Sequence, residues 1–111
     1  MSDCVFCKIV AGELPSQQVY SDERVIVFHD IFPEAPIHLV VIPRTHVVDF
    51  AELSADEELA GHLVKVATQV AQSVTSEGYR LVMNTGRDGG QTVFHAHMHI
   101  LGGRSLQWPP G

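Results

Sequence analysis

The sequence predicts an α+β domain in which a five-stranded antiparallel sheet packs against one long helix. One observation is a series of short segments rich in β-branched and aromatic residues, separated by turns that contain Gly, Pro, Asp or Ser. A second is a long amphipathic segment with apolar residues at spacings of three and four. The chain of 111 residues is also long enough to bury a core without disulfide bonds. We therefore expect residues 1–111 to form a single domain.

The five predicted strands cover residues 17–20, 24–30, 37–42, 79–85 and 95–101. Pro43 is expected to close the third of them, because proline cannot donate to a sheet ladder. The turn over residues 86–90 is glycine-rich and is expected to need a positive φ angle. It would bring the fourth and fifth strands together as neighbours.

Two helices are predicted, and the first is short. It would cover residues 3–12, with Asp3 as its N-cap. The long helix would run over residues 55–77, after a capping box formed by Ser54 and Glu57. Its apolar stripe consists of Leu59, Leu63, Val66, Val70 and Val74.

The composition excludes several classes of protein. A formal net charge of −6 argues against a general nucleic-acid binder, which would normally be basic. No apolar run approaches the roughly 18 residues that a membrane span requires. The start of the chain lacks a basic segment followed by an apolar stretch, so no secretion signal is expected. These features predict a cytoplasmic protein that binds neither nucleic acid nor membrane.

The stretch most indicative of function places His95, His97 and His99 at alternate positions. Alternation of polar and apolar residues is typical of a strand with one buried face, so the three imidazoles would share a face. Such a group could bind a metal, since neutral imidazole is a common ligand. Alternatively, one histidine could be a nucleophile or base that its neighbours orient.

Hydrogen-bond donors beside the histidines favour chemistry on a phosphoryl group. The backbone N–H groups of Gly89 and Gly90 could form an anion-binding nest. Thr92 would add a hydroxyl donor, and Asn84 would add an amide from the neighbouring strand. Transfer of a phosphoryl group requires such positioning and charge stabilisation.

Several segments resemble the motifs of the histidine triad family. His95–Leu101 matches the pattern His-φ-His-φ-His-φ-φ, and further matches lie at residues 28–31, 35–38, 41–46 and 89–92. The tail over residues 102–111, with Trp108 and two prolines, resembles the Hint branch, the nucleoside phosphoramidases. The resemblance implies hydrolysis of the P–N bond of purine nucleoside 5′-phosphoramidates. A dinucleoside polyphosphate hydrolase, a nucleotidyl transferase and a nucleotide-binding regulatory module with vestigial activity remain alternatives.

The resemblance also implies roles for individual residues. His97 would be the nucleophile that forms a nucleotidyl intermediate, and His99 would donate to a phosphate oxygen. Thr92 would lie near the phosphate and the leaving nitrogen, and His38 would support the triad from an adjacent strand. The substrate-binding residues would be Asp30, Ile31, Asn84, Gly90, Gln91, Thr92, Val93, His97, His99 and Trp108.

Among these, Asp30 would accept hydrogen bonds from both ribose hydroxyls. Ile31 and Phe28 could contribute to a purine slot, although core packing would explain them equally well. Of the remaining histidines, His29 would line the pocket wall and His62 would face solvent from the long helix. No organic cofactor is expected.

Cys4 and Cys7 form a Cys-x-x-Cys pair. A closed tetrahedral zinc site needs two further ligands, and the alternative is two unligated thiols on one face of a short helix. The resemblance to bacterial-type members implies that His46 and His95 complete a structural zinc site. It also implies a two-fold homodimer with a continuous sheet, in which Trp108 approaches the active site of the partner.

Overall fold

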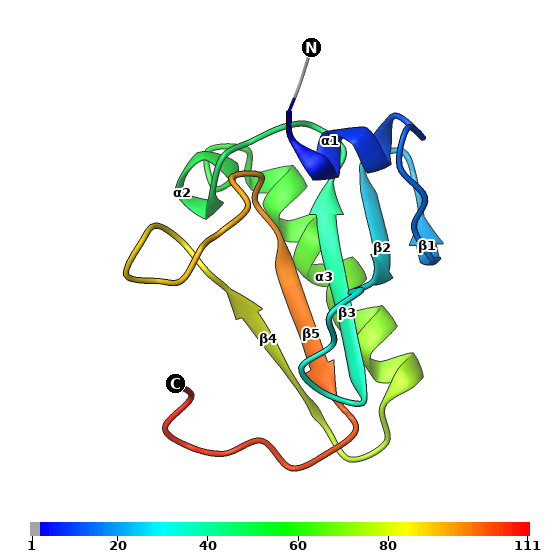
Figure 1. The fold of residues 1–111 in the computed structure, drawn as a ribbon, viewed down its shortest axis with the longest axis vertical. Helices are drawn as coiled ribbons and strands as arrows, with labels where there is room; N and C mark the ends of the chain where they lie inside the picture. Colours follow the sequence, from blue (N-terminus) through cyan, green and yellow to red (C-terminus); the bar gives the residue numbers. More distant parts are fainter. Residues whose placement is uncertain (1–2) are drawn as a thin grey trace.

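The computed structural model describes residues 3–111 and contains a five-stranded antiparallel sheet (Figure 1). The strands are β1 (Gln18–Ser21), β2 (Val25–His29), β3 (Ile37–Pro43), β4 (Tyr79–Met83) and β5 (Met98–Gly102), in the spatial order β1-β2-β3-β5-β4. The helices are α1 (Val5–Val10), α2 (Phe50–Leu53) and α3 (Glu57–Val74). The predicted sheet with one long and one short N-terminal helix is therefore confirmed. Among residues 3–111, no helix is long and apolar enough to cross a membrane.

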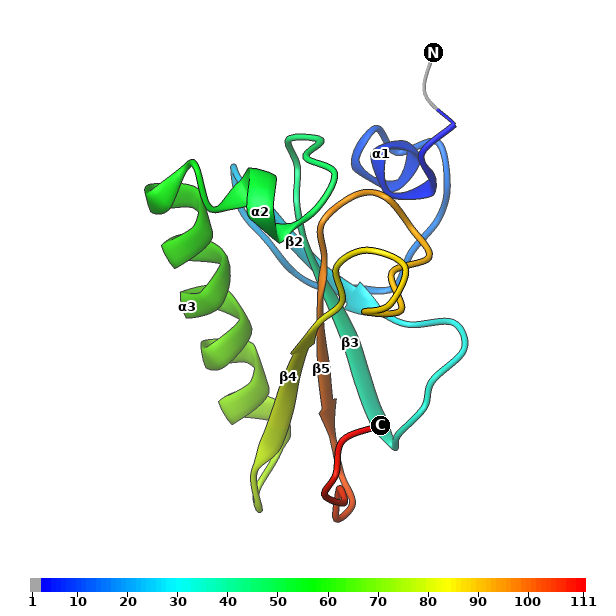
Figure 2. The same ribbon diagram turned by 90° about the vertical axis from the view of Figure 1, so that its left-hand side faces the viewer.

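The two faces of the sheet carry different layers. Helix α3 covers one face and α1 lies against one end of the other, as Figure 2 shows. Alternate residues of β2 and β3 divide between these layers: Val27 and Val41 pack with α3, whereas Phe28 and Val40 pack with α1. Val40 is paired in register with His99, so His99 shares the face that α1 partly covers. That face carries the candidate site.

The histidine stretch is only partly a strand, which corrects our prediction. Strand β5 begins at Met98, so His95 and His97 precede the ladder and His99 alone lies within it. The backbone N–H of Ala96 donates to the carbonyl of Val47 at 2.7 Å, which ties this segment to the connection after β3. The histidines are also more enclosed than an open strand face would make them, with His95 and His97 buried.

The beginning of α3 differs from the predicted capping box. Residues 50–53 form the separate helix α2, and the Ser54 hydroxyl donates to the carbonyl of Ala51 at 2.9 Å. Asp56 is the N-cap instead, accepting from the backbone N–H of Leu59 at 3.0 Å. Ser54 instead ends the additional helix α2 as its C-cap, so the N-cap of α3 lies two residues later.

The structure also differs from the predicted helices at the end of α3, at the start of α1 and in the surroundings of His62. Helix α3 ends at Val74, which is 39% exposed and lies outside the core stripe, while Ala67 and Ala71 are buried. Helix α1 begins after Cys4, whose Sγ accepts from the backbone N–H of Cys7 at 3.3 Å, so Asp3 is not the N-cap. His62 does not simply face solvent, because its Nε2 lies 2.7 Å from Oδ2 of Asp22.

Candidate active site and metal-binding group

The residues predicted to act on substrate surround a cavity of about 540 Å³ on the α1 face of the sheet. Its walls come from α1, the end of β2 with the loop that follows, the loop before β5, and His97 and His99. Of the ten predicted substrate-binding residues, all except Gln91 and Trp108 line this cavity. His29 also lines it, as predicted.

His97 is held in one tautomer by its own backbone surroundings. Its Nδ1 lies 2.8 Å from the carbonyl oxygen of His95, which can only accept, so Nδ1 carries the proton. In the neutral ring the lone pair is then on Nε2. Burial lowers the pKa of His97 below its usual value of 6.5, against the opposing effects of the His95 carbonyl and the Asp30 charge. His97 is therefore a neutral imidazole at pH 7, with Nε2 as the nitrogen available for reaction.

His99 has the complementary tautomer, which is set through His38. The backbone N–H of Glu34 donates to Nδ1 of His38 at 2.9 Å, so the proton of neutral His38 is on Nε2. That nitrogen lies 2.9 Å from Nδ1 of His99 and 3.3 Å from Oδ2 of Asp30. His99 Nδ1 therefore accepts, and its own proton is on Nε2. The cavity wall thus presents a nitrogen lone pair on His97 and an N–H donor on His99.

The charge state of His99 follows from its surroundings. Burial, together with repulsion by His97 and His38, lowers the pKa of His99 from 6.5 to about 4, while the Asp30 charge opposes this shift. His99 is therefore neutral at pH 7, and its Nε2–H is an uncharged hydrogen-bond donor on the cavity wall.

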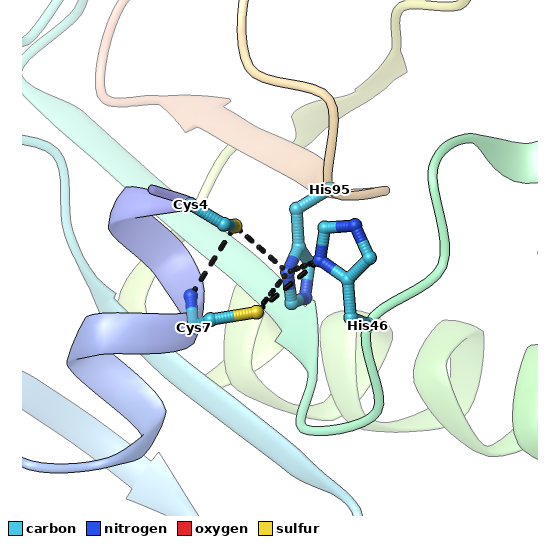
Figure 3. A group of neighbouring side chains, drawn as sticks. All are labelled: Cys4, Cys7, His46 and His95. Atoms are coloured by element: carbon cyan, nitrogen blue, oxygen red, sulfur yellow. Dashed lines mark hydrogen bonds between the residues drawn. The ribbon is translucent and has the colours of Figure 1, made fainter. Parts of the chain in front are cut away.

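A second group brings together Cys4 and Cys7 of the α1 segment, His46 and His95 (Figure 3). Nδ1 of His95 lies 3.3 Å from Sγ of Cys4 and 3.2 Å from Nδ1 of His46. Sγ of Cys7 lies 3.2 Å from Nδ1 of His46 and 3.6 Å from Nδ1 of His95. The four residues predicted as metal ligands therefore converge from three separate parts of the chain.

The donor set fits a metal ion. Nε2 of His95 donates to the carbonyl of Pro43 at 2.9 Å, so the lone pair on Nδ1 faces the sulfur atoms. Zinc with bond lengths of about 2.0–2.3 Å would separate its tetrahedral ligands by roughly 3.3–3.8 Å. The observed separations of 3.2–3.6 Å are close to that range. Two thiols and two imidazoles form a closed set that could hold a metal.

Asp30, His38 and His99 also place their ligand atoms close together. However, the Glu34 N–H occupies Nδ1 of His38, which leaves Nε2 protonated and unable to coordinate a cation. This group is arranged as a hydrogen-bond relay, in contrast to the cysteine-containing group.

The sequence and the fold of this chain both match those of known proteins. A family model described as the HIT domain matches residues 11–106. The chain belongs to the HIT family. A HIT-like protein of Synechococcus elongatus is 47% identical over 111 residues, which cover 98% of this chain and 97% of that protein.

Solved HIT structures share the fold over nearly the whole chain. A HIT family hydrolase from Legionella pneumophila Philadelphia 1 has a TM-score of 0.93 and 43% identity, covering 98% of this chain and 100% of that one. A HIT family hydrolase from Clostridium thermocellum has a TM-score of 0.90 and 44% identity, covering 96% of each chain. These two proteins, described as HIT family hydrolases, therefore share both family and fold with this chain.

In this HIT domain, Phe6 of α1 connects the two groups of histidines. Its ring packs edge-on against His97, with centroids 5.0 Å apart, and against His95, with centroids 5.8 Å apart. It also contacts the ring of Phe28 at 5.7 Å. Phe6 was not among the residues predicted to form the site. Its position between Cys4 and Cys7 could have indicated a place in the site, because metal ligation at both cysteines would fix the direction of the Phe6 side chain.

The loop before β5 is braced by side chains that were predicted to bind substrate. Nδ2 of Asn84 donates to the carbonyl of Gly89 at 2.7 Å. The Gln91 side chain is buried, accepts from the Gly86 N–H at 3.0 Å and donates to the Val48 carbonyl at 2.7 Å. It therefore supports the loop from behind and lies outside the cavity lining.

The prediction of an anion-binding nest in this loop is only partly correct. Gly86 and Gly90 have φ angles of +73° and +83°, which confirms the expected positive φ. The N–H of Gly90 donates to the carbonyl of Arg87 at 3.1 Å, so the turn itself uses this donor.

Trp108 is 81% exposed and does not line the cavity of its own chain.

Proposed function

We propose that this HIT domain is a phosphoramidase of the Hint type, which hydrolyses the P–N bond of purine nucleoside 5′-phosphoramidates through a nucleotidyl intermediate on His97. The observation that carries this proposal is the pair of opposite tautomers in one cavity wall. His97 has its lone pair on Nε2, and neighbouring His99 has its proton on Nε2. Their ring centroids are 5.0 Å apart, a separation that suits attack on phosphorus by one ring and donation to a phosphoryl oxygen by the other.

In the first step, Nε2 of His97 attacks the α-phosphorus and the P–N bond breaks. The leaving nitrogen takes a proton from solvent, and His97 becomes a cationic nucleotidyl-imidazole. The carbonyl of His95 already accepts from Nδ1–H of this ring and would stabilise the positive charge. His99 Nε2–H and the Thr92 hydroxyl would donate to the phosphoryl oxygens. Water then attacks phosphorus, loses a proton to solvent and breaks the P–Nε2 bond, which releases the nucleoside monophosphate and neutral His97.

The nucleoside would occupy the rest of the cavity. Asp30 accepts from the Phe32 N–H with Oδ1 and lies beside His38 with Oδ2, and each oxygen keeps a lone pair for a ribose hydroxyl. Val5, Phe6 and Phe28 supply an apolar wall for the base, with Ile31 at the rim. Asn84, Gly90 and Val93 line the phosphate end, whereas Gln91 would contribute through the loop that it braces.

We assign Cys4, Cys7, His46 and His95 to a structural zinc ion. A zinc ion bound there would crosslink the start of α1 to the segment before β5, and the four protein ligands leave no open position for substrate. The chain itself then presents Phe6 to His97 from a fixed helix. An intracellular location, where thiols stay reduced, is consistent with this assignment.

The proposed assembly is a two-fold homodimer. Strand β4 lies at an edge of the sheet, where a second copy could extend it. Trp108 is exposed and outside its own cavity, consistent with a role at the active site of a partner.

The proposal is tested by following release of AMP from adenosine 5′-phosphoramidate. His97→Ala is expected to lower kcat/KM by at least about a thousandfold, because it removes the nucleophile. His62→Ala, which removes a histidine that does not line the cavity, is expected to change it by less than about twofold. A covalent nucleotidyl adduct should form on wild type and be absent from His97→Ala. Full activity of His97→Ala, or faster turnover of diadenosine polyphosphates by wild type, would contradict the proposal.

A further inference from the structure

Two large apolar side chains stand almost fully exposed beside the cavity. Ile31 and Phe32 are 82% and 76% exposed, and both line the cavity that holds His97. Surface apolar residues are common, but two adjacent ones at the mouth of a binding cavity indicate a surface that a ligand covers. An aromatic ring is also a platform on which a nucleobase can stack.

Phe32 is tied to the residue proposed to bind ribose. Its backbone N–H donates to Oδ1 of Asp30 at 2.8 Å, which fixes the start of this loop relative to that carboxylate. In a nucleotide the base is attached directly to the ribose. A ribose held by Asp30 would therefore place its base within reach of Phe32, between the loop and the apolar wall around Phe6.

We propose that Phe32 is a specificity-determining residue, whose ring packs on the face of the bound base that would otherwise remain in water. This inference rests on the proposed function and adds a residue that selects the base. Stacking favours the larger purine ring system, because it overlaps more of the phenyl surface. Phe32 would then contribute to purine preference without touching the phosphate.

The test compares three ligands by isothermal titration calorimetry: AMP, CMP and ribose 5-phosphate. Phe32→Ala is expected to weaken AMP binding about tenfold and CMP binding about threefold. Ribose 5-phosphate has no base and should bind Phe32→Ala within about twofold of wild type. Phe32→Tyr keeps the ring and should retain most of the AMP affinity. Phe94→Ala is the matched control, because Phe94 is 57% exposed but does not line this cavity.

Other results would overturn the role of Phe32 or the proposed function. Unchanged AMP affinity in Phe32→Ala would overturn the inference and leave the proposed function standing. An equal loss for AMP and ribose 5-phosphate would also overturn it, because Phe32 would then act through the position of Asp30. If light scattering gave Phe32→Ala a lower molecular mass than wild type, Phe32 would instead be covered by another copy of the chain, which would also overturn the inference. Wild type that binds none of the three ligands would overturn the proposed function and this inference together.

Discussion

Nε2 of His38 lies 2.9 Å from Nδ1 of His99, and the backbone N–H of Glu34 donates to the opposite nitrogen of His38. A backbone amide can only donate, so it determines the tautomer of His38 and, through it, that of His99. The direction of the His99 hydrogen bond is thus set by a peptide group of the loop between β2 and β3.

Replacing His38 should therefore act on catalysis through His99. We expect His38→Ala to lower kcat/KM for adenosine 5′-phosphoramidate by roughly 10- to 100-fold. His38→Gln should recover part of this loss, because its amide can accept from Glu34 and donate to His99. Nitrogen chemical shifts should show the His99 proton on Nε2 in wild type and a mixture of tautomers in His38→Ala. Equal activity losses with an unchanged His99 tautomer would mean that His38 has a packing role only.

The low pKa of His99 makes a prediction about stability against pH. Its folded-state pKa is about 4, against 6.5 for the ordinary group, so below pH 6.5 the unfolded chain binds a proton that the folded chain does not. The contribution of His99 is complete above pH 6.5 and is lost as the pH falls towards 4. Between pH 7 and pH 5, wild type should lose roughly 2 kcal/mol more unfolding free energy than His99→Gln. Urea titrations at the two pH values measure this difference, and parallel losses would contradict the assignment.

Metal removal should disturb both stability and catalysis. Protein purified without added metal is expected to contain about one zinc per chain, and Cys7→Ser should contain much less. Loss of the metal should lower Tm by several degrees and reduce kcat, because α1 would no longer hold Phe6 against His97. Phe6→Leu separates the two effects, since it should retain zinc while losing the ring contact with His97. Wild type with a small fraction of one zinc per chain would contradict the zinc assignment.

The Asp22 carboxylate should contribute to stability without affecting catalysis. It accepts from the Tyr20 hydroxyl, from His62, and from the backbone N–H groups of Arg24 and Val25. Although burial opposes ionisation, these donors hold the pKa of Asp22 well below its usual range. We expect Asp22→Ala to lower the unfolding free energy by about 2 kcal/mol and His62→Ala by about 1 kcal/mol. Unfolding in urea measures both, and kcat/KM should stay within about twofold of wild type.

The elements with clear local signals were predictable from sequence. β-Branched runs bounded by turns gave the strands, and apolar spacing gave the body of α3. The predicted N-cap of α3 was wrong, because Ser54 and Asp56 both have side chains suited to an N-cap and only the short helix α2 decides between them. The alternation around His97 suggested a continuous strand, but the Ala96 N–H pairs with Val47, a contact across 49 residues that no local pattern encodes.

The metal-binding group shows what a family pattern adds to local reasoning. Spacing alone identified Cys4 and Cys7, while His46 and His95 followed from motif matching, and the structure brings all four together. The directions of the ring protons could not be predicted, because they depend on partners distant in sequence such as Pro43 for His95 and Glu34 for His38. The direction of the Gln91 amide could not be predicted for a similar reason, since it depends on the burial of this side chain behind the loop.

One position of the turn that precedes the histidines has no room for a side chain. A Cβ atom at Gly89 would clash with the carbonyl oxygen of Thr85, although φ at this residue is not positive. The adjacent Arg87 and Asp88 side chains are 94% and 93% exposed, so nothing comparable restricts them. Positions 87 and 88 are therefore open to substitution in engineered libraries, whereas the path of the loop depends on the absence of a methyl-sized group at Gly89.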